Sequence, residues 1–429
     1  MKVLITGGCG FIGVNLVKYL SERGHTVSIL DNLSVGRKEY LEALPLPKLP
    51  ELIIEDIRNK EAMDKAVEGM DAVVHLAAHT SVPQSLEDPG EDWDINVNGT
   101  LNLLESCRQN KVNKFIFASS NAVVGEQSPP IDETKVPQPL SPYGASKLAG
   151  EALCFAYRHS FGLKTISLRF ANCYGPYSEH TASVIPRFLS WAREGEPLII
   201  YGDGEQSRDF IHVDDVCQAI LLALTASTSQ LSSNDCQLFQ IASGAETSIN
   251  ELAELIREIV TDSRSNTQDS ELRIIYEAER KGEIKRNYSD ISKARTLLGF
   301  EPKVKLRDGL HHLWECTGGS KRMKVCAVVA AYNEAKTIEE VILGAKKYVD
   351  TVFVVDDGST DNTAEIARNN GALLISHPVN RGPAAAVQTG YAAAIARGFD
   401  YIVQMDADGQ HDPRYIPRLL KAALDDDCD

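Results

Sequence analysis

Tyr143 and Lys147 are four residues apart in a stretch with helical periodicity, so both side chains are expected on one face of a helix. An isolated tyrosine has a pKa near 10, which is too high for a base at neutral pH. A lysine ammonium group beside it favours the phenolate and lowers that pKa. The pair could therefore remove a proton from an alcohol while the same carbon loses a hydride. Two exposed helix residues would have the same spacing, so the assignment depends on the rest of the chain.

A glycine-rich segment, TGGCGFIG at residues 6–13, follows an apolar run and precedes an amphipathic one. Its glycines would allow a tight turn and a close approach of a pyrophosphate to the amide groups of a helix N-terminus. Asp31 ends the next apolar run, where a carboxylate accepts hydrogen bonds from an adenosine ribose and repels a 2′-phosphate. The segment therefore predicts a dinucleotide site that prefers NAD. Arg37 is close in sequence and keeps NADP as the alternative.

These side chains must be positioned by short β-branched runs that alternate with longer amphipathic stretches. Strands are predicted at 2–6, 26–30, 51–55, 72–78, 114–119 and 164–170, and helices at 11–23, 60–68, 93–109 and 143–160. Near-continuous apolar strands that alternate with helices indicate an α/β fold with a doubly wound parallel sheet. We expect this Rossmann domain to span residues 1–170, with returning segments around 209–245. Residues 171–316 would form mainly a smaller substrate-binding lobe.

A second α/β pattern begins after a short polar segment at 317–322, which we expect to be a linker. The apolar run that follows Met323 predicts a strand. Further strands are expected at 351–355, 372–376 and 400–405, with helices between them. Residues 323–429 would therefore form a separate domain.

The composition is that of a globular protein and excludes several classes. The net charge of −16 argues against nucleic acid as a partner, because such proteins need a basic surface. The nine cysteines are scattered without a CxxC pair, so neither a zinc site nor a disulfide framework is expected. No apolar run reaches the roughly 18 residues of a membrane-spanning helix, and no secretory leader is recognisable. We expect a cytoplasmic protein with buried free thiols.

Seven motifs in the first three-quarters of the chain carry a family resemblance. They are TGGCGFIG (6–13), DNLSVGR (31–37), HLAAHTSVPQS (75–85), NVNGTLNLLE (96–105), YGASK (143–147), RFANCYGP (169–176) and GDGEQSRDFIHVDD (202–215). In this order they resemble the extended short-chain dehydrogenase/reductase family, the NAD-dependent sugar-nucleotide epimerases and dehydratases. The resemblance implies that Asp56 and Ile57 lie against the adenine. It implies that NAD is bound by Gly7, Gly10, Phe11, Ile12, Gly13, Asp31, Asn32, Asp56, Ile57, Tyr143 and Lys147.

The resemblance also implies a third catalytic residue, Ser120, whose hydroxyl would bond the reacting sugar oxygen; Ser119 is the competing choice. The related 4,6-dehydratases carry an Asp-Glu acid and base pair where this chain has Asn121 and Ala122. Dehydration is therefore disfavoured. We expect a 4-epimerase of a nucleotide hexose (UDP-glucose/galactose or the N-acetyl forms), with a decarboxylase as the alternative. Val124 replaces the tyrosine that is usual in the family, and that tyrosine is not catalytic.

For the substrate, the arginines that bind the diphosphate in the family correspond to Arg208 and Arg280. Guanidinium groups suit diphosphate oxygens because they donate two parallel hydrogen bonds. Asn172 would contact a phosphate or sugar oxygen, and Ser81 lies in the segment expected to bind the sugar. The family position that controls access of the C2 substituent falls at Asn287, which is of intermediate size and favours a permissive pocket.

The resemblance also bears on assembly. Helices at 93–109 and 143–160 resemble those that pair two subunits through a four-helix bundle in this family, so a homodimer is expected. A non-catalytic scaffold that binds a nucleotide sugar beside a transferase would share the fold. The intact Ser120, Tyr143 and Lys147 argue against a scaffold.

Residues 323–429 resemble the first half of family-2 glycosyltransferases, closest to the polyprenyl-phosphate sugar synthases. The motifs are AAYNE (330–334), VVDDGSTDNT (354–363), NRGPAAAVQTG (380–390) and DADGQH (406–411). The resemblance implies that Asp357 binds the nucleotide base and that Asp406 and Asp408, with Gln410 on the same edge, reach a Mg²⁺ or Mn²⁺ ion. It suggests a link to a polyprenyl-phosphate pathway. The chain ends soon after the metal motif, so we expect a truncated, nucleotide-binding half-domain of glycosyltransferase A type.

Overall fold

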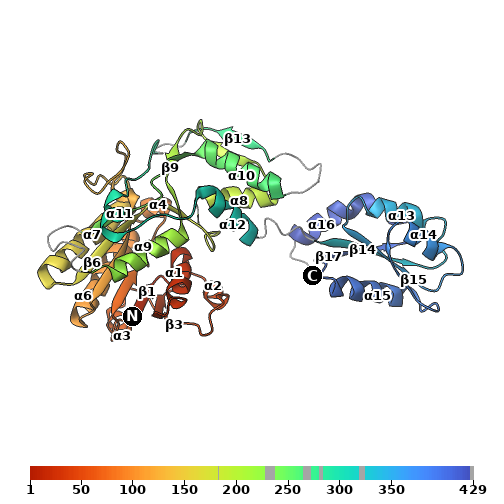
Figure 1. Cartoon of the computed structure of the whole chain (residues 1–429), viewed down its shortest axis with the longest axis horizontal. Helices are drawn as coiled ribbons and strands as arrows, with labels where there is room; N and C mark the ends of the chain where they lie inside the picture. Colours follow the sequence, from red (N-terminus) through yellow and green to blue (C-terminus); the bar gives the residue numbers. More distant parts are fainter. Residues whose placement is uncertain (182, 228–236, 264–271, 280–283, 318–323, 426–429) are drawn as a thin grey trace. The chain divides into compact units, whose positions relative to one another are not determined.

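Seven parallel strands organise the first of two units, residues Met1–Ser320, and four parallel strands organise the second, residues Lys321–Asp429 (Figure 1). The computed structural model describes residues 1–181, 183–227, 237–263, 272–279, 284–317 and 324–425. The predicted doubly wound parallel sheet in the first unit is confirmed, and so is the α/β character of the second.

The strands of the first sheet follow the order β11-β6-β5-β4-β1-β2-β3. The chain adds β2 and β3 on one side of β1 and then β4, β5, β6 and β11 on the other side, so the strand order reverses between β1 and β4. That point is where doubly wound sheets bind ligands. The strands are β1 (Lys2–Thr6), β2 (Thr26–Asp31), β3 (Glu51–Ile54), β4 (Ala72–His75), β5 (Lys114–Ser120), β6 (Lys164–Phe170) and β11 (Leu238–Ile241).

Both faces of this sheet are covered by helices, because the side chains of its strands are apolar on both sides. Val3 and Ile5 of β1 pack toward α1 (Phe11–Ser21), α9 (Val213–Thr225) and α11 (Ser292–Leu298). Leu4, between them, packs toward α3 (Lys60–Ala66), α6 (Gly99–Gln109) and α7 (Pro142–Phe161) on the other face. The sequence analysis assigned residues 292–298 to the lobe, whereas Ala294 and Leu298 pack in the core of the sheet.

Two predicted elements differ in the structure. The strand predicted at 72–78 ends at His75, because its partner β1 ends at the paired residue Thr6; the Leu76 amide makes the last hydrogen bond of the ladder, to the Thr6 carbonyl at 3.1 Å. The helix predicted at 93–109 is interrupted by a π-helical turn, η1 (Asp94–Asn98). At this turn the Thr100 hydroxyl donates to the Asn96 carbonyl at 2.6 Å.

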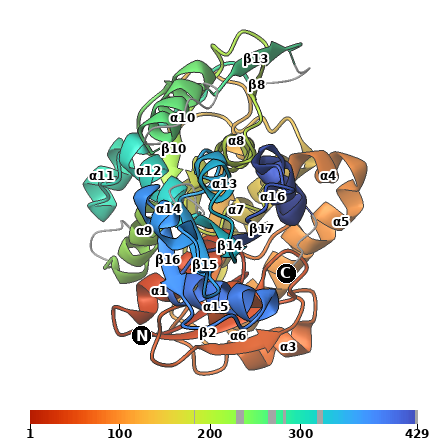
Figure 2. The ribbon, with the colours of Figure 1, turned by 90° about the vertical axis from the view of Figure 1, so that its right-hand side faces the viewer.

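A smaller lobe with its own apolar core lies at one end of the first unit, at the top of Figure 2. Its main elements are α8 (Val184–Glu194), β8 (Leu198–Tyr201), α10 (Ile249–Ser263), β13 (Ile274–Glu277) and α12 (Leu306–Cys316). Trp314, Phe188 and Leu252 are almost fully buried in this core. Short elements complete the unit: α2 (Lys38–Glu42), α4 (Val82–Glu87), α5 (Pro89–Trp93), η2 (Asn121–Val123), β7 (Asn172–Tyr174), β9 (Ser207–Arg208), β10 (Phe210–His212) and β12 (Thr247–Ser248).

The second unit has the strand order β16-β15-β14-β17, all parallel. Its strands are β14 (Val325–Ala331), β15 (Thr351–Asp356), β16 (Leu373–Ser376) and β17 (Tyr401–Asp406). Side chains alternate along β14, so Ala327 and Val329 pack toward α13 (Ile338–Ala345), α14 (Thr363–Asn369) and α16 (Ile416–Asp425). Val328 packs toward α15 (Pro383–Ala396) on the other face (Figure 1). Within the described residues, no helix is long and apolar enough to cross a membrane.

Candidate active site

The glycine-rich turn joins β1 to α1 at the point where the strand order reverses. Gly7 has φ +70°, and a Cβ there would come within 2.7 Å of the Ala77 backbone nitrogen. A Cβ at Gly13 would come within 2.1 Å of the Gly7 carbonyl oxygen, so the turn and the helix pack without side chains between them. α1 begins at Phe11 directly after Gly10, and the amide groups of its first turn face this loop. The turn therefore fits a pyrophosphate at a helix N-terminus.

Asp31, at the end of β2, is buried beside this turn. Its carboxylate accepts hydrogen bonds from the Cys9 amide at 2.9 Å and from the Leu33 amide at 2.8 Å. Burial raises the pKa of Asp31, and these two amide hydrogen bonds act in the opposite direction. Each carboxylate oxygen has a second lone pair, so Asp31 can still accept hydrogen bonds from ribose hydroxyls.

Asp56 and Ile57 lie at the neighbouring edge of the sheet. Arg58 donates to both oxygens of Asp56, at 2.9 Å each, and Asn32 donates to one of them at 2.9 Å. The side-chain hydrogen bonds from Arg58 are the main reason why the pKa of Asp56 is lowered to about 2. Ile57 is buried against Gly99. The structure thus brings Asn32 and Asp56 together, and it adds Arg58, which the motif-based reasoning missed.

Tyr143 lies at the start of α7, close enough to Ser120 for the serine hydroxyl to act on its pKa. Lys147 was expected to lower the pKa of Tyr143, but this expectation is wrong. Burial raises the pKa of Tyr143 to about 12, Ser120 acts in the lowering direction, and Cys173 and Asp92 add to the rise. Desolvation of the phenolate therefore outweighs the effect that the sequence suggested.

Lys147 is buried one turn along the same helix, and its Nζ donates to the Ala118 carbonyl at 3.0 Å. The Nζ also lies 5.1 Å from the centre of the Phe117 ring. Burial lowers the pKa of Lys147 to about 8, against the raising effect of nearby acidic groups. The ammonium group is thus held against β5, on the same helix face as Tyr143.

Ser119 and Ser120 are neighbours on β5, so their side chains point to opposite faces of the sheet. The Ser119 hydroxyl donates to Glu151 at 2.5 Å and is buried on the opposite side from its neighbour. Glu151 in turn forms a buried ion pair with Arg169, at 2.8 Å to Nε and 2.7 Å to an Nη. Ser119 is therefore occupied, while Ser120 reaches Tyr143.

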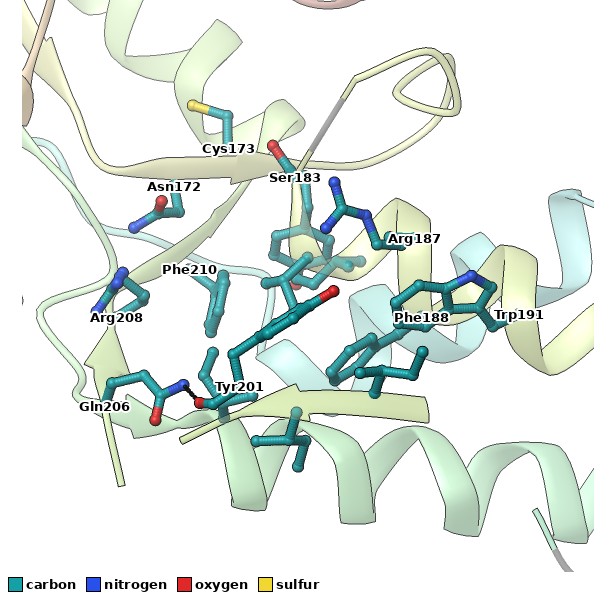
Figure 3. A pocket seen from close by; sticks show the side chains of 16 residues that line it. Asn172, Cys173, Ser183, Arg187, Phe188, Trp191, Tyr201, Gln206, Arg208 and Phe210 are labelled. Carbon is teal, nitrogen blue, oxygen red and sulfur yellow. Dashed lines mark hydrogen bonds between the residues drawn. The ribbon is translucent and has the colours of Figure 1, made fainter. Parts of the chain in front are cut away.

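A pocket of about 180 Å³ is lined by β7, β9 and β10 on one side and by the lobe elements α8, β8 and α10 on the other. Asn172 and Arg208, two of the predicted substrate-binding residues, are on its wall together with Phe210 (Figure 3). Arg208 donates to the carbonyls of Ser207 and Ile284, at 2.8 and 2.7 Å. The lining also includes Tyr174, Ser183, Arg187, Phe188, Trp191, Tyr201 and Gln206. Aromatic rings, an amide and guanidinium groups on one wall suit a nucleotide diphosphate.

The other predicted substrate residues are spread more widely. The Asn287 amide donates to the Ser207 carbonyl at 3.2 Å, next to Arg208. The side-chain oxygen of Asn287 is buried and has no hydrogen-bond partner among the described residues. Ser81 caps α4, where its hydroxyl accepts from the Gln84 amide at 3.3 Å. Arg280 lies outside the described residues.

In the second unit, Asp357 is buried at the end of β15. Its carboxylate accepts from the amides of Arg381 and Gly382, at 2.9 and 2.7 Å, and lies 2.7 Å from Nδ1 of His377. Burial raises the pKa of Asp357, but these hydrogen bonds outweigh it and the pKa is lower than usual. Asp357 thus holds the loop that begins the NRG motif, a contact that the sequence analysis did not anticipate.

Asp406 is the last residue of β17, Asp408 follows it, and both are exposed. Asp408 accepts from the Gln410 amide at 3.0 Å, and Asp406 lies 3.7 Å from Nε2 of His411. Within the described residues, no group of three or more His, Cys, Asp or Glu side chains could hold a metal ion by itself. Two exposed carboxylates fit a cation that takes its remaining oxygen ligands from a diphosphate.

The Rossmann-type sheet, its glycine turn and the buried Asp31 define a dinucleotide-binding enzyme fold. A family model described as "NAD dependent epimerase/dehydratase family" matches residues 3–237, and the chain belongs to this family. Residues 326–429 match a second model, "Glycosyl transferase family 2".

Known proteins resemble the first unit over nearly their full length. The UDP-glucose 4-epimerase of Thermotoga maritima, solved with UDP-glucose, has a TM-score of 0.67 and 35% identity, and the match covers 75% of this chain and 100% of that one. The Thermus thermophilus UDP-glucose 4-epimerase, solved with NAD, has a TM-score of 0.64 and 33% identity over 73% and 98% of the two chains. A Bacillus cytotoxicus UDP-N-acetyl-alpha-D-glucosaminuronate decarboxylase is 34% identical over 72% of this chain and 95% of its own length.

Proposed function

We propose that the chain catalyses the NAD-dependent 4-epimerisation of a nucleotide hexose through a transient 4-keto sugar. The observation that carries the proposal is that α7 places Tyr143 near Ser120 and buries Lys147 against β5, in the unit whose glycine turn fits a dinucleotide. Bound NAD would accept a hydride from C4 and return it to the other face of the ring. Two solved neighbours of this fold, one with UDP-glucose and one with NAD, support the same reading.

Each residue of the set has a role that its contacts support. Tyr143 takes the proton of the C4 hydroxyl and returns it after the 4-keto sugar has rotated to present its other face. Ser120 is near enough to Tyr143 to act on its pKa and would share the reacting oxygen with it. Lys147 carries the positive charge of the site, and the positive nicotinamide ring would add a second charge that lowers the pKa of Tyr143 from its value near 12.

The residues beside Ser120 favour epimerisation over dehydration. Asn121 donates to the Ser289 hydroxyl at 2.9 Å and is buried, and Ala122 has no group that can carry a proton. A dehydratase needs an acid and a base at such positions for the elimination of water. Decarboxylation needs neither an acid nor a base at these positions, so it is the second candidate function. The similarity to a UDP-N-acetyl-alpha-D-glucosaminuronate decarboxylase supports this candidate.

The substrate would be bound through its diphosphate by Arg208 and Asn172 on the pocket wall. The buried, unpartnered oxygen of Asn287 would accept a hydrogen bond from a sugar hydroxyl or an N-acetyl N–H. Both UDP-hexoses and their N-acetyl forms are therefore proposed substrates. The reaction would take place in the cytoplasm, where the buried free thiols of Cys9, Cys107 and Cys154 would stay reduced.

The proposed function is tested by incubating the purified chain with UDP-, dTDP- and GDP-hexoses, hexuronic acids and their N-acetyl forms, with NMR analysis of the products. A 4-epimer with unchanged mass is the expected product. A pentose with release of CO₂ would establish decarboxylation instead, and a 4-keto-6-deoxy sugar would establish dehydration.

We expect the purified protein to contain NAD, because a cofactor that is oxidised and reduced within one turnover has to remain bound. Gly13→Val should abolish NAD retention, because a Cβ at Gly13 already meets the Gly7 carbonyl oxygen at 2.1 Å. Chromatography of the nucleotide released on denaturation is the measurement. Gly24→Asn, in an open turn after the same helix, is the control and should retain NAD. Release of NADP from the wild type would contradict the assigned role of Asp31.

We also propose that the chain forms a homodimer through α6 and α7. Large apolar side chains are exposed on both helices: Leu101 at 39%, Phe155 at 42% and Phe161 at 54%. We expect light scattering at micromolar concentration to give the dimer mass and Leu101→Asp/Phe155→Asp to give the monomer mass. Val136→Asp, in an exposed loop of the same unit, is the control and should leave the mass unchanged. A monomeric wild type would refute this assembly.

For the second unit we propose binding of a nucleotide sugar with a divalent cation, in which Asp406 and Asp408 hold the cation. Its match to a glycosyltransferase family supports this, and a polyprenyl phosphate is the acceptor class that we propose. Asp408→Asn should weaken the binding of Mn²⁺ in the presence of UDP by about tenfold or more, measured from free Mn²⁺ by electron paramagnetic resonance. Glu340→Gln, an exposed carboxylate of α13, should leave it unchanged. Equal binding by Asp408→Asn would exclude this metal site.

A further inference from the structure

A buried carboxylate that neither the motifs nor the proposed mechanism uses lies beside the catalytic helix. Asp92, on α5, has a relative exposure of 1%. Buried carboxylates are uncommon unless their oxygens are fully hydrogen bonded. Asp92 accepts from the Ser146 hydroxyl at 2.7 Å and from the Asn96 amide at 3.2 Å, and its other contact is Nδ1 of His79 at 3.1 Å.

These partners belong to two different parts of the candidate site. Ser146 is on α7 between Tyr143 and Lys147, and its hydroxyl also lies 3.0 Å from the Tyr143 carbonyl. His79 begins the segment that holds Ser81, and its Nε2 lies 3.2 Å from the side-chain oxygen of Gln84. Asp92 is therefore the point where the segment expected to bind the sugar is joined to the helix that carries the base.

We propose that Asp92 is a positioning residue of the reaction, which holds the start of α7 against residues 79–84 and sets the charge around Lys147 through its carboxylate. This inference rests on the proposed function, because it assigns Asp92 to the epimerase site. Asp92 does not touch the reacting atoms. Its contacts with Ser146 and His79 position the start of α7, and its negative charge affects the protonation of Tyr143 and Lys147.

The charges that face Lys147 come from three elements. Asp92 on α5, and Cys154 and Glu151 on α7, favour its protonated form, with Asp92 the largest of the three. His75 on β4 is buried and neutral, because burial and Lys147 lower its pKa to about 3. Without the carboxylate of Asp92, burial would lower the pKa of Lys147 further below its value of about 8.

Tyr143 faces Ser120, Cys173 and Asp92. The negative charge of Asp92 disfavours the phenolate, so its removal lowers the pKa of Tyr143 as well. Loss of the Asp92 charge thus lowers the pKa of both Tyr143 and Lys147. Tyr143 becomes a base at lower pH, and Lys147 loses its proton at lower pH.

The test is Asp92→Asn, which preserves the shape of the side chain and removes the charge. We expect kcat for the epimerised sugar to fall and both limbs of its pH profile to move to lower pH by about one unit, with KM little changed. Glu91→Gln, an exposed carboxylate on the same helix, should leave the profile in place. Ser146→Ala removes one hydrogen bond but retains the charge, so it should change kcat without moving the limbs. Asp92→Ser is the second uncharged variant if Asp92→Asn does not fold.

A second measurement does not depend on turnover. The side-chain ¹³Cε resonance of Lys147, assigned by its absence in Lys147→Arg, should titrate at a pH of about 8 in the wild type. In Asp92→Asn the midpoint should be lower by about one unit. An unchanged midpoint would overturn the inference whether or not the chain epimerises a sugar. A shifted midpoint in a chain that converts no sugar would support the charge effect of Asp92 and contradict the proposed function alone.

Discussion

Replacement of Tyr143 by phenylalanine is expected to lower kcat for epimerisation by about 10²–10⁴-fold, because it removes the group that takes and returns the C4 proton. The substrate should still bind, since Arg208 and Asn172, the residues proposed to bind the diphosphate, lie on the pocket wall and do not depend on the phenol. Ring packing is preserved because only the hydroxyl and its interaction with Ser120 are lost. Turnover is measured by NMR and substrate binding by calorimetry.

The control for this variant is Tyr157→Phe. Tyr157 is on the same helix, and its hydroxyl donates to Glu105 at 3.2 Å, far along α7 from the site. It should epimerise at the wild-type rate. A loss of only a few-fold in Tyr143→Phe would mean that another group accepts the proton, and the assignment of Tyr143 would then be wrong.

The fold was predictable because periodicity reports burial directly. The runs at 2–6 and 114–119 place apolar side chains on both faces, and each forms a strand covered by helices on both sides. The strand end at His75 and the π-helical turn at 94–98 were not predictable. Both depend on segments that are distant in sequence: β4 ends where its partner β1 ends, and Asn96 donates to the His79 carbonyl.

The positions of the site residues followed from their motifs, whereas their electrostatics did not. The spacing of Tyr143 and Lys147 predicts one shared helix face, and α7 carries both. The pKa values depend on desolvation, which no local pattern reports, so the expected lowering of the Tyr143 pKa was wrong. Strand alternation could have separated Ser119 from Ser120, because neighbouring residues point to opposite faces. Choosing between the faces required knowing that Glu151 occupies one of them.

Residues that act through other residues were the hardest to find. Arg58 could have been noticed two positions after Asp56, since such spacing allows a local ion pair. Asp92 meets Ser146, which is 54 positions away, so no pattern in the sequence connects them. Asp357 was assigned to a nucleotide base from its motif, but its carboxylate is occupied by the amides of residues 381 and 382. The base-binding role of Asp357 therefore stays a prediction.

The buried pair of Glu151 and Arg169 supports the second large effect. Glu151→Gln is expected to destabilise the first unit by about 3–5 kcal/mol, because it leaves the Arg169 guanidinium charged and unpaired in the core. Arg169 is 2% exposed, and one of its Nη atoms already has no partner among the described residues. Glu151 is therefore the main group that compensates its charge, through two hydrogen bonds.

The measurement can be confined to the first unit, because all three tryptophans, Trp93, Trp191 and Trp314, belong to it. Denaturant unfolding followed by tryptophan fluorescence then reports the stability of that unit alone. The double variant Glu151→Met/Arg169→Met removes both charges and should be more stable than Glu151→Gln, since well-packed apolar side chains can replace a buried ion pair at little cost. Glu105→Gln, which breaks a largely exposed pair with Arg108 on α6, should leave the midpoint near the wild-type value. If Glu151→Gln were as stable as the wild type, water or another group would have to compensate the charge of Arg169, and the assigned role of Glu151 would be wrong.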